Sequence, residues 1–173
     1  MASNFITYTK HGVAESTLLK ATQVGHHYNL VNESKDIDNG SVAAIGDRKK
    51  ADVFEAKVPA KGDKIVLILT APKIYQEYET RMQEESNFYN GKGEVMRAYE
   101  IQDTDRFTLS TEAFNSEAEL AVGKYVFVDG TGFKLTTGEK PNMTEYGFVG
   151  HIYEVAANGN YRIWVDKNAQ VYA

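Results

Sequence analysis

The sequence predicts a mainly β protein, a small antiparallel β-sandwich or barrel with one short surface helix and an extended N-terminal arm. Short apolar segments recur along the chain with turn-forming residues between them. Two of these turns contain the pairs Asp129-Gly130 and Asn158-Gly159, which favour β-hairpins because both residue types tolerate positive φ. The chain also has 11 tyrosines and 8 phenylalanines, residues that pack well on half-buried sheets.

Residues 1–52 are expected to form the extended N-terminal arm and its loops, and residues 53–173 the β-rich body. The first segment has weak apolar periodicity, with at most one helical turn over residues 13–20, and it continues into turn chemistry between Asn32 and Gly40. Such a segment either moves freely or becomes ordered against a neighbouring molecule. The body is therefore expected to fold without residues 2–35.

The body is expected to begin with a strand over residues 53–58, followed by a strand over residues 64–70. The second segment is apolar on both faces, which is typical of a fully buried strand. Lys73 to Glu85 is the helix candidate, and its few bulky side chains place it on the surface. The remaining strands are predicted at residues 95–101 and 106–109, and as two hairpins that pair residues 124–128 with 133–136 and 148–155 with 161–165.

Composition and charge argue against several classes of partner. The net charge of −5 is unfavourable for a non-specific nucleic-acid binder, and the compact basic cluster, Arg48 to Lys50, is expected to be a solvated loop. No apolar segment approaches the roughly 20 residues of a membrane helix, and the N-terminus has no secretion-signal pattern. The absence of cysteine excludes disulfides, thiolate zinc sites and cysteine nucleophiles. Neither a nucleic acid nor a membrane is expected as a partner.

No motif indicates a metal site. Among the histidines, His26 and His27 are adjacent and would point to opposite faces of a strand, so they cannot easily share one ion. The segment from Asp36 to Gly40 superficially resembles a calcium loop. Its glycine is fifth and Asp47 is twelfth, where an EF-hand requires glycine at position six and glutamate at position twelve. We therefore interpret this segment as a turn.

Catalytic chemistry is equally unsupported. Asp103 and Asp105 could form a carboxylate pair, but they lie in a predicted turn, where solvation would keep their pKa values together. The glycine pairs at residues 91–93 and 130–132 are too short for phosphate-binding loops. The sequence therefore predicts a protein that is not an enzyme, with no catalytic, cofactor-binding or metal-binding residues and no cofactor.

Several motifs together resemble those of small head-associated proteins of tailed bacteriophages. They are an Asp-Asn-Gly turn, a Phe-Tyr-Asn-x-x-Gly segment, an Arg-Ala-Tyr strand, an Asp-x-Phe-Thr-Leu-Ser strand, a Val-Gly-x-Tyr-Val strand and a Phe-Val-Gly-x-Ile strand, which here begin at Asp38, Phe88, Arg97, Asp105, Val122 and Phe148. The resemblance covers roughly residues 36–165. Residues 1–35 have no counterpart in it.

The resemblance implies a virion protein, assembled in the host cytoplasm, that binds the major capsid protein and decorates or stabilises the phage head as a homo-oligomer or symmetric array. It implies no catalytic residues. Two alternatives remain open. A carbohydrate- or receptor-binding β-module would need clustered exposed aromatics, which Tyr146, Tyr153, Tyr161 and Trp164 could supply. A barrel that binds single-stranded nucleic acid would need aromatics interleaved with basic residues, and residues 161–164 come nearest to that pattern.

Overall fold

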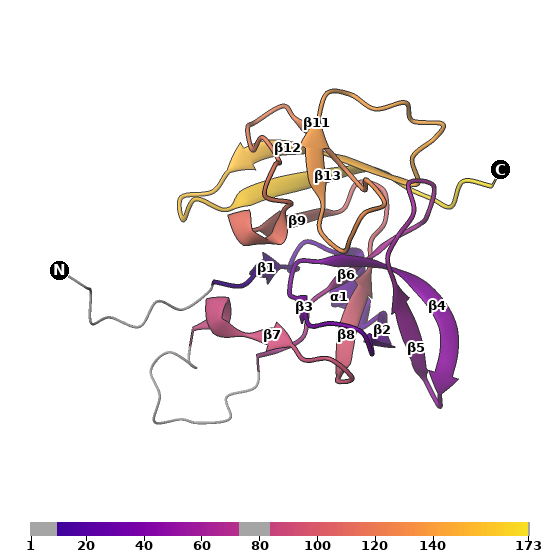
Figure 1. The fold of residues 1–173 in the computed structure, drawn as a ribbon. Helices are drawn as coiled ribbons and strands as arrows, with labels where there is room; N and C mark the ends of the chain where they lie inside the picture. The colour runs from indigo at the N-terminus through magenta and orange to yellow at the C-terminus, as the bar shows by residue number, and fades with distance from the viewer. Residues whose placement is uncertain (1–9, 73–83, 173) are drawn as a thin grey trace.

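The computed structural model describes residues 10–72 and 84–172. It confirms a mainly β fold and combines an open sheet with a barrel. The six-stranded sheet has the order β1-β9-β13-β12-β10-β11, and β2-β5-β4-β6-β8 form a closed barrel. Figure 1 shows the sheet stacked on the barrel, with the β4–β5 hairpin reaching away from the sheet.

The sheet is antiparallel throughout. Its strands are β1 (Ala14–Glu15), β9 (Arg106–Leu109), β10 (Tyr125–Phe127), β11 (Thr136–Gly138), β12 (Phe148–Val155) and β13 (Tyr161–Asn168). Both predicted hairpins form, β10 with β11 and β12 with β13. In the first hairpin the second strand starts at Thr136, later than predicted, because Phe133 leaves the sheet and packs in the barrel core.

The barrel contains one parallel pair among its antiparallel ones, β2 with β5. Its strands are β2 (His27–Val31), β4 (Val42–Lys50), β5 (Val53–Lys57), β6 (Val66–Ile68) and β8 (Val95–Glu100). A separate two-stranded ladder joins β3 (Ile37–Asp38) to β7 (Tyr89–Asn90).

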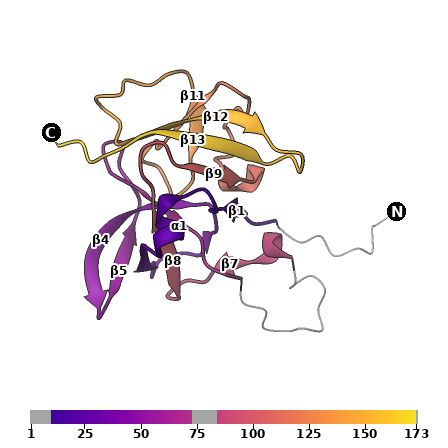
Figure 2. The ribbon, with the colours of Figure 1, turned by 180° about the vertical axis from the view of Figure 1, so that it is seen from behind.

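Helical structure in the described residues is short. The α-helix α1 (Lys20–Val24) ends at Gly25, whose φ is +70°, and lies beside β8 (Figure 2). Two 3-10 helices are η2 (Glu85–Asn87) and η3 (Thr111–Ala113). The surface helix predicted over Lys73 to Glu85 lies outside the described residues, except that Glu85 begins η2.

The alternation of β4 and β6 explains how the two halves share their cores. Val42 and Leu67 face the core between the barrel and the sheet, whereas Ala43 and Val66 face the core inside the barrel. All four side chains are almost fully buried. Because period-2 strands with two buried faces are apolar at every position, this confirms the prediction of a buried strand within residues 64–70.

The prediction of an extended arm over residues 1–52 is wrong for the described part of that segment. Strands β2 and β4 form two of the barrel walls, and Leu19 and Leu30 are fully buried. The boundary at residue 52 falls inside the β4–β5 hairpin. Residues 10–52 look weakly patterned because their apolar side chains are divided between two cores and several short elements. Residues 1–9 lie outside the described range.

Candidate functional site

The outer face of the six-stranded sheet presents a row of ring-bearing and cationic side chains. On β9, β10, β12 and β13 the alternate residues Phe107, Val126, Ile152 and Ile163 point into the core against the barrel. Their neighbours point to the other face of the sheet, where several are partly exposed. Four of these neighbours lie directly opposite one another, Tyr125 opposite His151, His151 opposite Trp164, and Trp164 opposite Arg106. We call these four residues the aromatic row.

Ring contacts run along the aromatic row. The Tyr125 and His151 ring centroids are 6.2 Å apart, and the Arg106 guanidinium lies 5.6 Å from the centroid of the Trp164 indole. Contacts of this kind between cross-strand neighbours stabilise a sheet by about 0.2–1 kcal/mol each. All four side chains are partly exposed, so the row offers contact area to a partner and is already held in place.

A β-bulge enlarges this surface. The register of β12 against β13 shifts between Ile152 and Glu154, which leaves Tyr153 unpaired in the ladder. Its ring meets the Trp164 indole edge-on, with centroids 6.2 Å apart and an interplanar angle of 88°. Beside them, Glu154 accepts a hydrogen bond from Arg162 at 2.9 Å.

The His151 ring is oriented by the carboxylate of Asp166, which is not itself part of the aromatic row. Its Nδ1 lies 2.8 Å from Oδ2 of Asp166, and about a third of the His151 side chain is exposed. Because Asp166 and Trp164 both lie on β13, this contact fixes the ring between two side chains of the neighbouring strand.

The four aromatics proposed from sequence as a carbohydrate site are separated by the fold. Tyr153 and Trp164 meet on the outer face. Tyr146 packs edge-on against Phe127 at 5.1 Å. Tyr161 lies against the core between the sheet and the barrel, with its ring 6.0 Å from that of Phe114. Tyr125, His151 and Arg106, which complete the row, were missed because only strand pairing shows which residues of separate strands lie opposite.

The basic and aromatic residues over 161–164 do not make one nucleic-acid-binding stripe. Tyr161 and Ile163 face the core, whereas Arg162 and Trp164 face solvent. Arg162 is paired with Glu154. The cluster Arg48 to Lys50 lies at the exposed end of β4, where the Arg48 guanidinium donates to the carbonyl of Ala51.

The carboxylates weighed as catalytic groups have structural partners. Asp105 is 1% exposed, so the expected solvation of this turn is wrong for that residue. Its carboxylate accepts hydrogen bonds from the backbone N–H groups of Gln102 and Lys20, at 2.9 and 3.3 Å. Asp103 accepts one from the N–H of Asn168 at 2.8 Å. The burial of Asp105 was not predictable from its local sequence, because the N–H of Lys20, one of its two donors, is 85 residues away in the chain.

The segment compared with a calcium loop is the centre of a buried amide network. Asn39 donates to the carbonyl of Thr70 and accepts from its N–H, at 2.9 and 3.0 Å. Asn90 donates to Asn39 at 3.1 Å. Gly40 adopts a φ of +83°, as its predicted turn requires. These hydrogen bonds join the segments around Asn39, Thr70 and Asn90. The Asn39 side chain therefore has a structural role.

The histidines lie apart and form separate contacts. His11 Nδ1 is 2.7 Å from Asp38, His26 Nδ1 is 2.7 Å from Glu100, and His27 Nδ1 is 3.0 Å from the carbonyl of Gly25. Over residues 10–72 and 84–172, no three His, Asp or Glu side chains gather in a way that could hold a metal ion.

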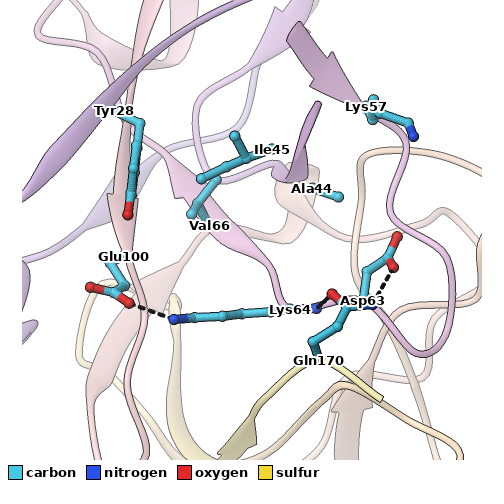
Figure 3. A pocket seen from close by; sticks show the side chains of 9 residues that line it. All are labelled: Tyr28, Ala44, Ile45, Lys57, Asp63, Lys64, Val66, Glu100 and Gln170. Carbon is cyan, nitrogen blue, oxygen red and sulfur yellow. Dashed lines mark hydrogen bonds and ion pairs between the residues drawn. The ribbon is translucent and has the colours of Figure 1, made fainter. Parts of the chain in front are cut away.

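One carboxylate at the end of the barrel is electrostatically distinct. The hydrogen bond from the Lys64 ammonium to Glu100 lowers the pKa of Glu100, helped by the charges of Lys64 and His26 and opposed by burial. The Glu100 side chain is 13% exposed. It lines a pocket of about 270 Å³ (Figure 3).

No protein-family model, curated protein or solved structure matches this chain. In the described part of the chain, no helix is long and apolar enough to span a membrane.

Proposed function

We propose that this protein is a non-enzymatic structural protein of a virion, which binds the major capsid protein and decorates or stabilises the head of a tailed bacteriophage. The aromatic row is the observation that supports a binding role. Trp, Tyr and Arg are the residues in which interface binding energy concentrates. Here they lie side by side on an outward-facing sheet, each partly exposed. The sequence motifs that resemble phage head-associated proteins support the choice of partner.

The aromatic row also replaces the N-terminal segment as the proposed contact. Residues 10–52 are built into the barrel and its core, so they are not free to reach a neighbour as an extended arm. The outer face of the sheet turns away from the barrel. A rigid sheet face also loses little conformational entropy on binding, because cross-strand contacts already position its side chains.

A decoration protein needs only a modest interface in each copy. Many copies on one lattice act together, so weak individual contacts give strong retention by avidity. We expect the protein to occupy the capsid as a homo-oligomer or symmetric array and to be found in the virion after assembly in the host cytoplasm.

The test is co-sedimentation of the purified protein with capsids assembled without it. Trp164→Ala and Arg106→Ala should each weaken binding by about 30-fold, equivalent to about 2 kcal/mol, the cost of removing an interface hot spot. Tyr172→Ala is the matched control, since Tyr172 is 87% exposed and lies outside the row. Thermal unfolding of each variant separates lost binding from lost folding.

If both row variants fold and bind capsids as the wild type does, the contact lies on another face of the protein. Failure of the wild-type protein to bind any capsid would end the proposal.

A carbohydrate-binding module is the second candidate, favoured by the contact between Tyr153 and Trp164 on the exposed face. Sugars stack on open ring faces, and the guanidinium of Arg106 covers one face of the indole. Glycan binding without capsid binding, lost in Trp164→Ala, would favour this candidate.

A further inference from the structure

The chain contains three Asn-Gly pairs, Asn39-Gly40, Asn90-Gly91 and Asn158-Gly159. In such a pair the main-chain nitrogen of the glycine can attack the side-chain amide of the asparagine, because glycine has no Cβ to obstruct the approach. The attack needs water, an asparagine side chain that is free to turn, and space for the ring that forms. The fold supplies these conditions to the three pairs unequally.

The first two pairs lie in the interior of the protein. Asn39 is 5% exposed and Asn90 is 3% exposed. Both NH2 groups, which would leave as ammonia, are held by hydrogen bonds. The one on Asn39 donates to the carbonyl of Thr70 at 2.9 Å, and the one on Asn90 donates to the carbonyl of Ile37 at 3.0 Å and to Asn39 at 3.1 Å. These two side chains are therefore screened from water and fixed in place.

Asn158 lies in the exposed turn between β12 and β13, which Figure 1 shows at the free end of the hairpin. Its NH2 group makes no hydrogen bond within the described residues. Its side-chain oxygen accepts a hydrogen bond from the N–H of Asn160 at 3.1 Å. That bond polarises the carbonyl and would stabilise the negative charge that develops on the oxygen when a nitrogen adds to the carbon. The Asn158 amide is thus both accessible and activated.

The space around Gly159 is open. A Cβ placed on Gly159 would meet nothing within 4 Å, whereas one on Gly40 would lie 2.9 Å from the Cβ of Ala113. A ring can therefore form at Gly159 without displacing other atoms. The N–H of Gly159 donates to the carbonyl of Ala156 at 2.9 Å, and this bond must break before the nitrogen reacts. Because it lies in an exposed turn, its opening should cost little free energy.

We propose that Asn158 is a site of spontaneous deamidation, and that the fold protects Asn39 and Asn90 from the same reaction. The Gly159 nitrogen gives up its proton to water and forms a bond to Cγ of Asn158. The bond from Cγ to the side-chain nitrogen breaks, ammonia leaves, and a five-membered succinimide remains. Water then opens the ring at one of its two carbonyls and leaves aspartate or isoaspartate.

Each reaction consumes one water molecule, releases one ammonia molecule and involves no oxidation. Either product adds one negative charge at the end of the hairpin, so the modified protein should separate from the unmodified protein in ion exchange. The proposal is independent of the capsid-binding role, because neither Asn158 nor Gly159 belongs to the aromatic row.

The test incubates the whole folded protein at mildly alkaline pH, digests it under acidic conditions and follows the three Asn-Gly peptides by mass spectrometry. The signal is the gain in mass when an NH2 group is replaced by OH. Asn158 should convert at least about tenfold faster than Asn39 or Asn90, the ratio that a local opening free energy of about 1.4 kcal/mol produces. Incubation in urea is the control, since the three pairs should convert at similar rates once the chain is unfolded.

Asn158→Gln is the matched variant. It keeps an amide at this position, but its longer side chain would have to form a less favourable six-membered ring. The φ of Asn158 is not positive, so glutamine fits the backbone there. The main acidic species that forms in the incubated wild type should be absent from Asn158→Gln.

Three results would overturn the proposal. The first is conversion of Asn158 in the folded protein no faster than that of Asn39 and Asn90. The second is an equally strong preference for Asn158 in urea, which would place its cause in the local sequence and not in the fold. The third is formation of the same acidic species in Asn158→Gln.

Discussion

Asn168, near the end of β13, joins the sheet to the barrel through its side chain. Its amide accepts a hydrogen bond from the N–H of Ile65 at 2.9 Å and donates to the carbonyls of Ile65 and Ile101, each at 2.8 Å. Asn168 is 7% exposed, and both isoleucines are fully buried. One side chain therefore satisfies three backbone groups where β6 begins and β8 ends.

Replacing this side chain should be costly. Asn168→Ala leaves one buried N–H and two buried carbonyls without their partner, and each such group costs about 1 kcal/mol or more. We expect a loss of about 2–4 kcal/mol in the free energy of unfolding. A water molecule entering the vacated space would bring the loss toward the lower value. For a chain of 173 residues a loss of about 3 kcal/mol lowers the unfolding temperature by about 6–12 °C.

The assay is urea unfolding followed by tryptophan fluorescence, supported by thermal unfolding. Asn160→Ala is the matched control in the same hairpin, because the Asn160 side chain makes no hydrogen bond within the described residues. Asn168→Asp should be at least as damaging as Asn168→Ala, since a carboxylate cannot donate to the two carbonyls. A loss below about 1 kcal/mol in Asn168→Ala, or an equal loss in the control, would refute the reasoning.

Three further predictions follow from turns, charge and chain connectivity. Gly159→Val should cost about 1 kcal/mol or more in thermal stability, because the φ of Gly159 is +84°, and an unchanged unfolding temperature would contradict this. The lowered pKa of Glu100 stabilises the fold above pH 4.5, its ordinary pKa, and this contribution is lost as the pH falls through the lower folded-state value. Acid titration of Glu100→Gln should therefore show a shallower loss of stability than the wild type, and identical slopes would disprove the contribution. Deleting residues 2–35 should prevent folding, since it removes β2 and the buried Leu30, and a cooperative unfolding transition in the truncated protein would show that the barrel closes without them.

The hairpins of the C-terminal half were predictable because their information is local. The Asn158-Gly159 turn and the flanking apolar alternation specify β12 and β13 within one short stretch of chain. The first hairpin was predicted less well for a physical reason. Phenylalanine favours strands, so Phe133 was predicted to begin one. In the structure its ring packs with the barrel core, and its carbonyl accepts a hydrogen bond from the N–H of Val42 at 2.7 Å.

Residues 10–52 show where local reasoning fails. Each of their strands is short or irregular, and β4 has register shifts against β5 after Ile45 and after Arg48. The buried residues of this segment line a closed barrel whose last strand, β8, begins only at Val95, so no short window of sequence contains the whole pattern. The same limit hid the burial of Asp105, whose partner Lys20 is 85 residues away.

Local chemistry in the chain was enough to indicate the β class, the buried character of the segment around Leu67, the positive-φ glycines and the lack of thiol chemistry. These features depend on neighbours within a few residues, where steric and hydrogen-bonding preferences act directly. Tertiary structure decided the closure of the barrel, the aromatic row and the pocket that Glu100 lines at the end of the barrel. Each of these arises from pairing between strands distant in sequence, and the register that places Tyr125, His151, Trp164 and Arg106 side by side is set by how both cores pack.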